Sequence, residues 1–152
     1  MAAPSFRHRR PASEKASAAA RGASKKSGTK PELALRRALW RAGLRYRKNV
    51  VSLPGKPDIV FKGARVAVFC DGDFWHGRDW PGRRARLAEG HNSDYWIAKI
   101  ERNMERDRRN NEELARMGWT VVRVWEGDVE ARLDALVDEV RALVQKRRGR
   151  PS

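Results

Sequence analysis

The chain has 152 residues, enough for one compact domain, and its 34 Lys and Arg against 19 Asp and Glu give a net charge of +15. It contains no apolar run of the about 18–20 residues needed to span a bilayer. Cys70 is the sole cysteine. A single thiol excludes an internal disulfide and a cysteine-cluster zinc site, which fits a reducing cytoplasm. The charge favours a polyanionic partner, because neutralised phosphates release counterions, but charge alone leaves DNA, RNA and acidic membranes as alternatives.

Three regions differ in composition. Residues 1–28 are rich in Ala, Ser, Arg and Lys and lack a sustained apolar period, which predicts a disordered basic arm. A folded domain is expected over residues 29–146, followed by a basic tail over residues 147–152.

The folded part is expected to begin with a helix. Thr29 and Glu32 form a capping-box pattern, in which Thr29 caps the helix and Glu32 reaches back to the N–H of the cap. Apolar residues then recur at helical spacing as far as Gly43, which predicts the end of the helix. A short strand is predicted over residues 44–51.

Two apolar runs, residues 59–61 and 66–69, are joined by a short link, which predicts an antiparallel hairpin covered on both faces. The other predicted elements are a loop over 72–92, a long helix over about 93–117, a strand over 119–125 and a helix over 129–144. The order α-β-β-β-α-β-α describes an α/β fold with a mixed sheet flanked by helices.

Two acids flank the hairpin. Asp58 precedes its first strand and Asp71 follows its second, so both should meet at one edge of the sheet. Oxygen ligands gathered in this way suit Mg²⁺, which would also relieve their repulsion; the alternative is that both are ordinary turn acids. The pattern Pro57-Asp58 followed by Cys70-Asp71 is also similar to the loose motif of PD-(D/E)xK nucleases.

The stretch from Val68 to Gly77, VFCDGDFWHG, is more specific. It resembles the core of the very short patch repair (Vsr) DNA mismatch endonucleases, a family of the restriction-endonuclease-like superfamily. The resemblance extends, in the same order, to residues 29–32, 53–58, 95–96, 99–103, 106–109, 118–121 and 124–126. It implies a restriction-endonuclease-like fold and a Mg²⁺-dependent endonuclease that nicks one strand at or near a T:G mismatch. The partner is then double-stranded DNA rather than a membrane, and we expect a cytoplasmic, nucleoid-associated monomer of bacterial type.

The resemblance also implies roles for individual residues. Asp58 corresponds to the principal metal-binding acid, with Asp71 beside it, and the backbone carbonyl of Cys70 to a magnesium contact. His76 corresponds to a catalytic general base or acid; its less favoured alternative role is a histidine stacked in an aromatic loop. Glu32 matches an active-site glutamate, yet its capping-box role explains it as well.

DNA-binding roles are implied for a further set of residues. The aromatic rings of Phe74, Trp75 and Trp96 are expected to wedge into the base stack beside the mismatch; their alternative role is core packing. Polar residues of the long helix form a basic side that could contact phosphates or could be a solvated face. These residues are Lys99, Arg102, Asn103, Arg106 and Arg109.

The sequence departs from the family in two places. Relatives often hold a structural zinc with Cys and His near the aromatic loop, but Asp73 and Arg78 stand where ligands are usual, so we predict no zinc. Packing must then hold the loop, together with an ion pair of Asp73 with Arg78 or Arg83. Asp71 stands where the best-known members have a histidine. Two alternatives therefore remain: a mismatch-independent nuclease of a DNA-defence system, and a non-catalytic DNA-binding module on a decayed nuclease fold.

Overall fold

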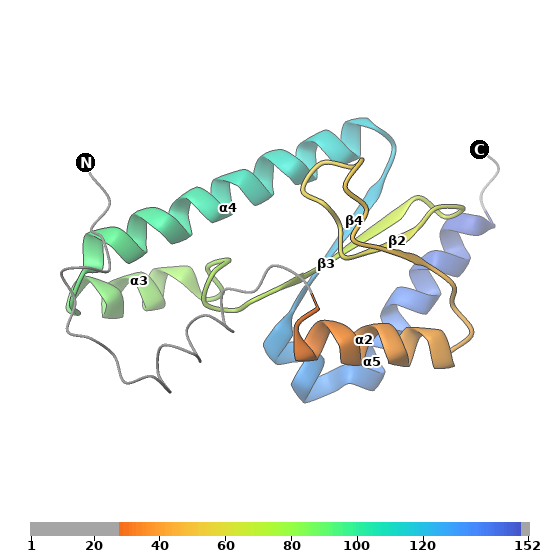
Figure 1. Ribbon diagram of the computed structural model, residues 1–152, viewed down its shortest axis with the longest axis horizontal. Helices are drawn as coiled ribbons and strands as arrows, with labels where there is room; N and C mark the ends of the chain where they lie inside the picture. Colours follow the sequence, from red (N-terminus) through yellow and green to blue (C-terminus); the bar gives the residue numbers. More distant parts are fainter. Residues whose placement is uncertain (1–27, 150–152) are drawn as a thin grey trace.

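The computed structural model describes residues 28–149, so all but the last residue of the expected arm lies outside the described part. The described chain forms a four-stranded sheet with helices around it (Figure 1). In chain order the elements are α2 (Lys30–Arg41), β1 (Arg47–Lys48), β2 (Ile59–Phe61), β3 (Val66–Asp71), α3 (Trp80–Ala88), α4 (Ser93–Arg116), β4 (Thr120–Trp125) and α5 (Glu126–Arg148). None of the described helices is both long enough and apolar enough to cross a membrane.

The sheet has the order β1-β2-β3-β4 and is mixed. β2 and β3 form the predicted antiparallel hairpin, with Ile59 opposite Val68, and every residue of β2 is buried. β4 lies parallel to β3, which requires the crossover through α3 and α4. The predicted α/β fold with a mixed, restriction-endonuclease-like sheet is confirmed.

The two faces of the sheet are covered unequally. On one face α2 and α5 pack together and bury the main core, including Leu35, Phe61 and Val140. The other face carries a smaller cluster in which Ala67 and Phe69 meet Leu114 of α4. Burial on both faces explains why the runs of β2 and β3 are apolar without alternation.

Helix α4 is 24 residues long, and only its C-terminal part lies over the sheet (Figure 1). Its N-terminal part runs away from the sheet with α3 beside it, and α3 itself has no buried residue.

The structure corrects several predicted boundaries. The predicted loop over 72–92 contains α3, which sequence periodicity missed because Pro81 and Gly82 interrupt a segment without a buried stripe. The strand predicted over 44–51 is reduced to Arg47–Lys48, since Asn49 has a positive φ of 51°. The final helix runs to Arg148 instead of ending at 144, so the first two residues of the expected basic tail are helical.

Candidate active site

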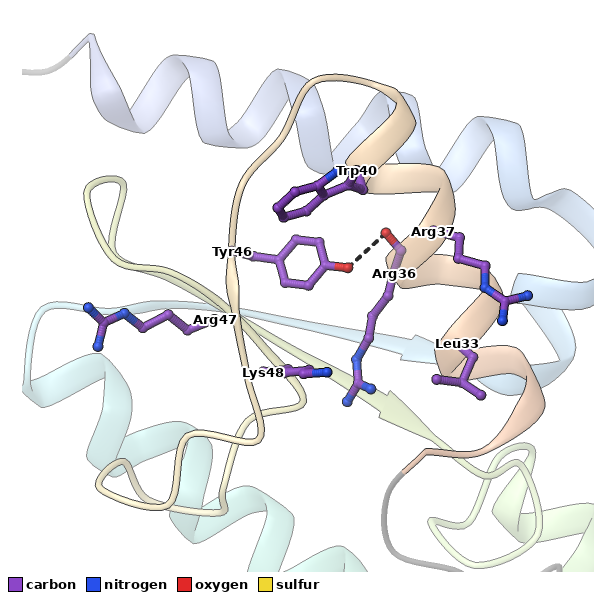
Figure 2. A pocket seen from close by; sticks show the side chains of 7 residues that line it. All are labelled: Leu33, Arg36, Arg37, Trp40, Tyr46, Arg47 and Lys48. Atoms are coloured by element: carbon purple, nitrogen blue, oxygen red, sulfur yellow. Dashed lines mark hydrogen bonds between the residues drawn. The ribbon is translucent and has the colours of Figure 1, made fainter.

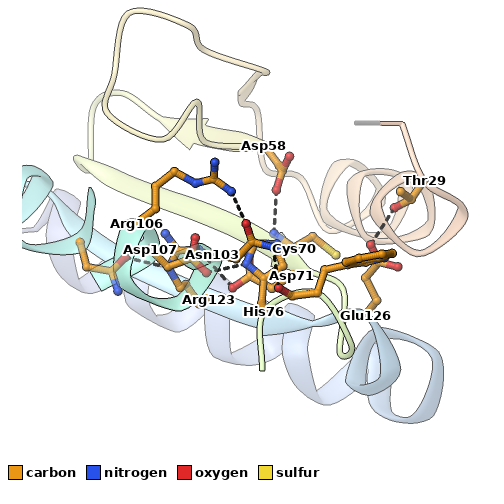
Figure 3. Close-up of polar contacts among 12 residues, drawn as sticks. Thr29, Asp58, Cys70, Asp71, His76, Asn103, Arg106, Asp107, Arg123 and Glu126 are labelled. Carbon is orange, nitrogen blue, oxygen red and sulfur yellow. Dashed lines mark hydrogen bonds and ion pairs between the residues drawn. The ribbon is translucent and has the colours of Figure 1, made fainter. Parts of the chain in front are cut away.

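Asp58 sits immediately before β2 and is almost fully buried. Its Oδ2 atom accepts a hydrogen bond of 2.7 Å from the backbone N–H of Cys70 (Figure 3). Burial raises the pKa of Asp58 to about 7, and the negative charges of Glu32 and Asp71 add to the rise, against the opposing effect of the Cys70 amide. A buried acid with two acidic neighbours would be stabilised by a cation.

Cys70 presents its backbone to Asp58 and its side chain elsewhere. In a strand the N–H and C=O of one residue face the same side, so the Cys70 carbonyl faces the side on which Asp58 lies. The thiol packs against the α2–α5 core, and burial raises its pKa, which keeps it protonated. The backbone of Cys70, rather than its sulfur, therefore belongs to the site.

Asp71 ends β3 and is paired with Arg123 of β4. Nη1 of Arg123 lies 3.1 Å from both carboxylate oxygens of Asp71, and its Nε donates to Asn111 at 2.7 Å. Burial raises the pKa of Asp71, while the charges of His76 and Arg123 oppose that rise. The guanidinium of Arg123 thus neutralises part of the negative charge of the two acids, which the sequence analysis expected a metal ion alone to neutralise.

His76 is held by an acid of α4. Its Nδ1 atom lies 2.5 Å from Oδ2 of Asp107, and Oδ1 of Asp107 lies 3.5 Å from Nη1 of Arg123. Burial lowers the pKa of His76, but the hydrogen bond to Asp107 and the charges of Asp71 and Asp107 outweigh it, leaving the pKa above its ordinary value of 6.5. Ligand atoms of Asp71, His76 and Asp107 lie within 4.8 Å of one another, a grouping that could hold a metal ion.

Glu32 lies in the first turn of α2, and its carboxylate makes a different contact from the one predicted. Thr29 caps α2 as predicted, since its hydroxyl accepts from the Glu32 N–H. The Glu32 carboxylate, however, accepts from the N–H of Gly28, one residue before the cap, and pairs with the buried Arg36. The charge of Glu32 also raises the pKa of Asp58.

The three expected wedge residues contact one another where the loop before α3 meets the first turn of α4. The ring centroids of Phe74 and Trp75 lie 4.9 Å apart, and those of Trp75 and Trp96 lie 5.5 Å apart. All three side chains are half-buried. The ammonium of Lys99 lies 4.8 Å from the Trp75 ring centroid, which adds a cation to this aromatic cluster.

The polar residues of α4 differ in their exposure and in their bonding partners. Asn103 donates to the carbonyl of Trp75 at 2.9 Å and accepts from Arg106 at 2.6 Å, so it fixes the aromatic loop as well as facing the site. Arg102 and Arg106 are exposed, as a phosphate contact requires. Arg109 is exposed but lies 3.6 Å from Glu105, which reduces the charge it offers to DNA.

An ion-pair network fixes the loop where relatives often carry zinc. Arg78 lies 3.2 Å from Asp73 and 2.8 Å from Asp128, and Asp73 also accepts from the N–H of Gly127 at 3.0 Å. The predicted pairing of Asp73 with Arg78 is confirmed. We call these residues the Arg78 clamp; it ties the aromatic loop to the start of α5.

The Gly77 position shows how closely this loop approaches α4. Its φ is +77°, and a Cβ there would lie 2.4 Å from the sulfur of Met104. Only glycine fits both the backbone conformation and the contact. The geometry of the Phe74–His76 segment therefore depends on Gly77.

Comparison with known proteins shows the family to which this chain belongs. Residues 12–82 match the family of the DNA mismatch endonuclease Vsr. The type II nicking enzyme V.NmeDIP of Neisseria meningitidis serogroup C is 49% identical over 126 residues, covering 83% of this chain and 84% of that enzyme. The chain belongs to the Vsr family.

Two further relatives agree with this assignment. The type II nicking enzyme V.HpaIIP of Haemophilus parainfluenzae is 44% identical over 127 residues, covering 84% of this chain and 89% of that enzyme. The DNA mismatch endonuclease Vsr of Escherichia coli strain K12 is 37% identical over 97 residues, covering 64% of this chain and 60% of that enzyme. This Vsr-family protein is a DNA endonuclease, and DNA is its substrate.

Sequence reasoning missed two residues of the site, Asp107 and Arg123. Asn103, Asp107 and Asn111 recur every fourth residue of α4, and each bonds a group of the site, so their spacing was a usable signal. Arg123 was signalled by its position as a lone charge within the apolar strand β4.

Proposed function

We propose that this Vsr-family endonuclease is Mg²⁺-dependent and nicks one DNA strand at or near a T:G mismatch. The observation that carries the proposal is the group of Asp71, His76 and Asp107, whose ligand atoms lie within 4.8 Å of one another, with Asp58 bonded to the backbone of the adjacent Cys70 (Figure 3). Acids that would bind a metal thus lie beside a histidine whose basicity suits proton transfer near neutral pH.

The donor set fits magnesium. Asp58, Asp71 and the Cys70 carbonyl supply hard oxygen donors, and both carboxylates are buried. Magnesium bound there would polarise the scissile phosphate and lower the pKa of a water molecule. We propose that these three residues hold the ion.

His76 supplies the proton transfer. With Nδ1 hydrogen-bonded to Asp107, its Nε2 atom remains to accept a proton from the attacking water. Arg123 holds both Asp107 and Asp71, and so keeps the acids around His76 in place.

The mismatch preference rests on the aromatic cluster of Phe74, Trp75 and Trp96. Separating stacked bases costs least at a mismatch, and inserted rings recover part of the stacking energy. A second candidate, nicking without mismatch preference, is favoured by the packing of these rings against one another, which reduces the surface left for stacking on bases.

A nicking assay separates the two candidates. Matched and T:G-mismatched duplexes of one sequence are incubated with the protein, in Mg²⁺ or in EDTA. We expect nicks in one strand of the mismatched duplex, in Mg²⁺ only. Equal nicking of both duplexes would support the second candidate, and nicking in EDTA would contradict the proposed metal dependence.

A further inference from the structure

A basic pocket lies between α2 and β1, outside the cluster formed by Asp58, Asp71 and His76 (Figure 2). Its volume is about 490 Å³, and it is open to solvent. The described residues that line this α2–β1 pocket are Leu33, Arg36, Arg37, Trp40, Tyr46, Arg47 and Lys48. None of them is acidic, so the pocket selects for an anion.

Its positive charge is largely free. Arg37, Arg47 and Lys48 are exposed, and within residues 28–149 they form no ion pair. Arg36 is only 6% exposed and bonds Glu32 and Asn49 through Nη2, but its buried Nε has no hydrogen-bond partner within the same residues. The cations free to meet a ligand in the pocket are therefore Arg37, Arg47 and Lys48.

The walls of the pocket include apolar side chains, and contacts with neighbouring residues hold two of its aromatic rings in place. Trp40 is 49% exposed and Leu33 is 38% exposed. Arg45 covers the Trp40 ring at 3.7 Å from its centroid, and the Tyr46 hydroxyl donates to the Arg36 carbonyl at 2.9 Å. A ligand that suits both the cations and these walls combines phosphate groups with an apolar sugar face, as a nucleic-acid backbone does.

The pocket is joined to the active site by short links. Arg36 pairs with Glu32, whose charge acts on Asp58, and the N–H of Asn49 donates to the Asp58 carbonyl at 3.1 Å. Lys48 lies opposite Ile59, the residue after Asp58, in the β1–β2 ladder. A strand held at Asp58 would therefore reach the α2–β1 pocket within a short distance along its backbone.

From these contacts we infer that the α2–β1 pocket binds the sugar-phosphate backbone of the DNA strand on one side of the bond that is cleaved. The inference rests on DNA being the substrate and adds a subsite outside the catalytic centre. This subsite contributes to affinity and to the placement of the protein on the duplex. Its link to the catalytic centre is the ion pair between Arg36 and Glu32.

Binding to a labelled duplex in EDTA, across a range of KCl concentrations, tests the inference without any cleavage. Replacing Arg47 and Lys48 together by alanine should raise Kd roughly tenfold and lower the slope of log K against log salt by about 2, or about 0.9 for each phosphate that is no longer neutralised. Both side chains are exposed, so folding should be retained, and a circular dichroism melt verifies it. The matched control is Arg141→Ala with Lys146→Ala, two exposed cations of α5.

Duplexes shortened on one side or the other of the nick site then locate the binding flank. The wild-type chain should lose affinity when one particular flank is removed, whereas the Arg47→Ala/Lys48→Ala variant should bind the long and short duplexes alike. Equal Kd values and salt slopes for the pocket variant and the α5 control would overturn the inference and assign the pocket to another anion. Because binding is measured without metal, a failure of the proposed nicking mechanism would leave this result interpretable.

Discussion

Asp107 and His76, separated by 31 residues in the chain, lie with Oδ2 and Nδ1 only 2.5 Å apart. The pair links α4 to the aromatic loop and fixes the orientation of the imidazole ring. Because Nδ1 is occupied by the acid, Nε2 is the atom available for proton transfer. His76 can therefore act with Asp107 as an oriented base.

Replacing Asp107 by asparagine should lower the single-turnover nicking rate by about 100-fold, because the histidine loses both its orientation and its charge partner. The low-pH limb of the rate profile should also shift to lower pH, since Asp107 raises the pKa of His76. The matched control is Glu105→Gln, an exposed acid of the same helix. Equal rates for the two variants would show that Asp107 is not part of the mechanism.

Arg123→Ala should destabilise the protein by about 2 kcal/mol, because it leaves Asp71 and Asp107 without their shared cation in a half-buried setting. Urea unfolding measures this loss. Arg132→Ala removes an exposed pair with Glu139 and should change little. If both variants unfold at the same urea concentration, Arg123 does not neutralise the site.

Asp58 should make the metal-free protein less stable as pH rises. Its pKa is raised from 3.8 to about 7 on folding, so its contribution is most favourable below about pH 4, where it is protonated in both states, and is lost as pH rises through about 7. Asp58→Asn, which can still accept from the Cys70 N–H, should therefore be more stable than wild type by about 2–4 kcal/mol at pH 8, and equal to it at pH 4. Urea unfolding in EDTA at the two pH values measures the difference.

Magnesium should reverse this order. A divalent ion at Asp58 stabilises only the folded state, so added Mg²⁺ should raise the Tm of wild type and leave that of Asp58→Asn almost unchanged. Equal Mg²⁺ responses in the two proteins would place the ion elsewhere.

The Arg78 clamp should replace the function of a structural metal. Arg78→Ala removes the links from the aromatic loop to Asp73 and Asp128, and should lower the Tm. A zinc chelator should leave the Tm of the wild-type protein unchanged. A chelator-induced fall would mean that a metal, rather than the clamp, holds the loop.

The fold was predictable from the sequence where a local pattern determines it. The apolar runs at 59–61 and 66–69 predicted the hairpin, and Thr29 predicted the start of α2. Helix α3 was not predicted, because it buries no residue and so has no apolar stripe.

The site was predictable only in part for a related reason. Asp58 and Asp71 flank one hairpin, so local topology places both at the same end of the β2–β3 pair. Arg123 reaches Asp71 across 52 residues, through the parallel pairing of β3 with β4, and no local pattern specifies that register. Contacts of this kind depend on the packing of the whole sheet.

The nicking rate of Asp58→Asn on a duplex that the wild-type protein cuts in Mg²⁺ tests the account most directly. The exposed Asp138→Asn of α5 serves as the matched control, and a gel shift verifies that each variant still binds the duplex. We predict a fall of about a thousandfold or more for Asp58→Asn, equivalent to about 4 kcal/mol of transition-state stabilisation, with DNA binding retained. A rate close to that of wild type would contradict the assignment of Asp58 as the centre of the metal-dependent reaction.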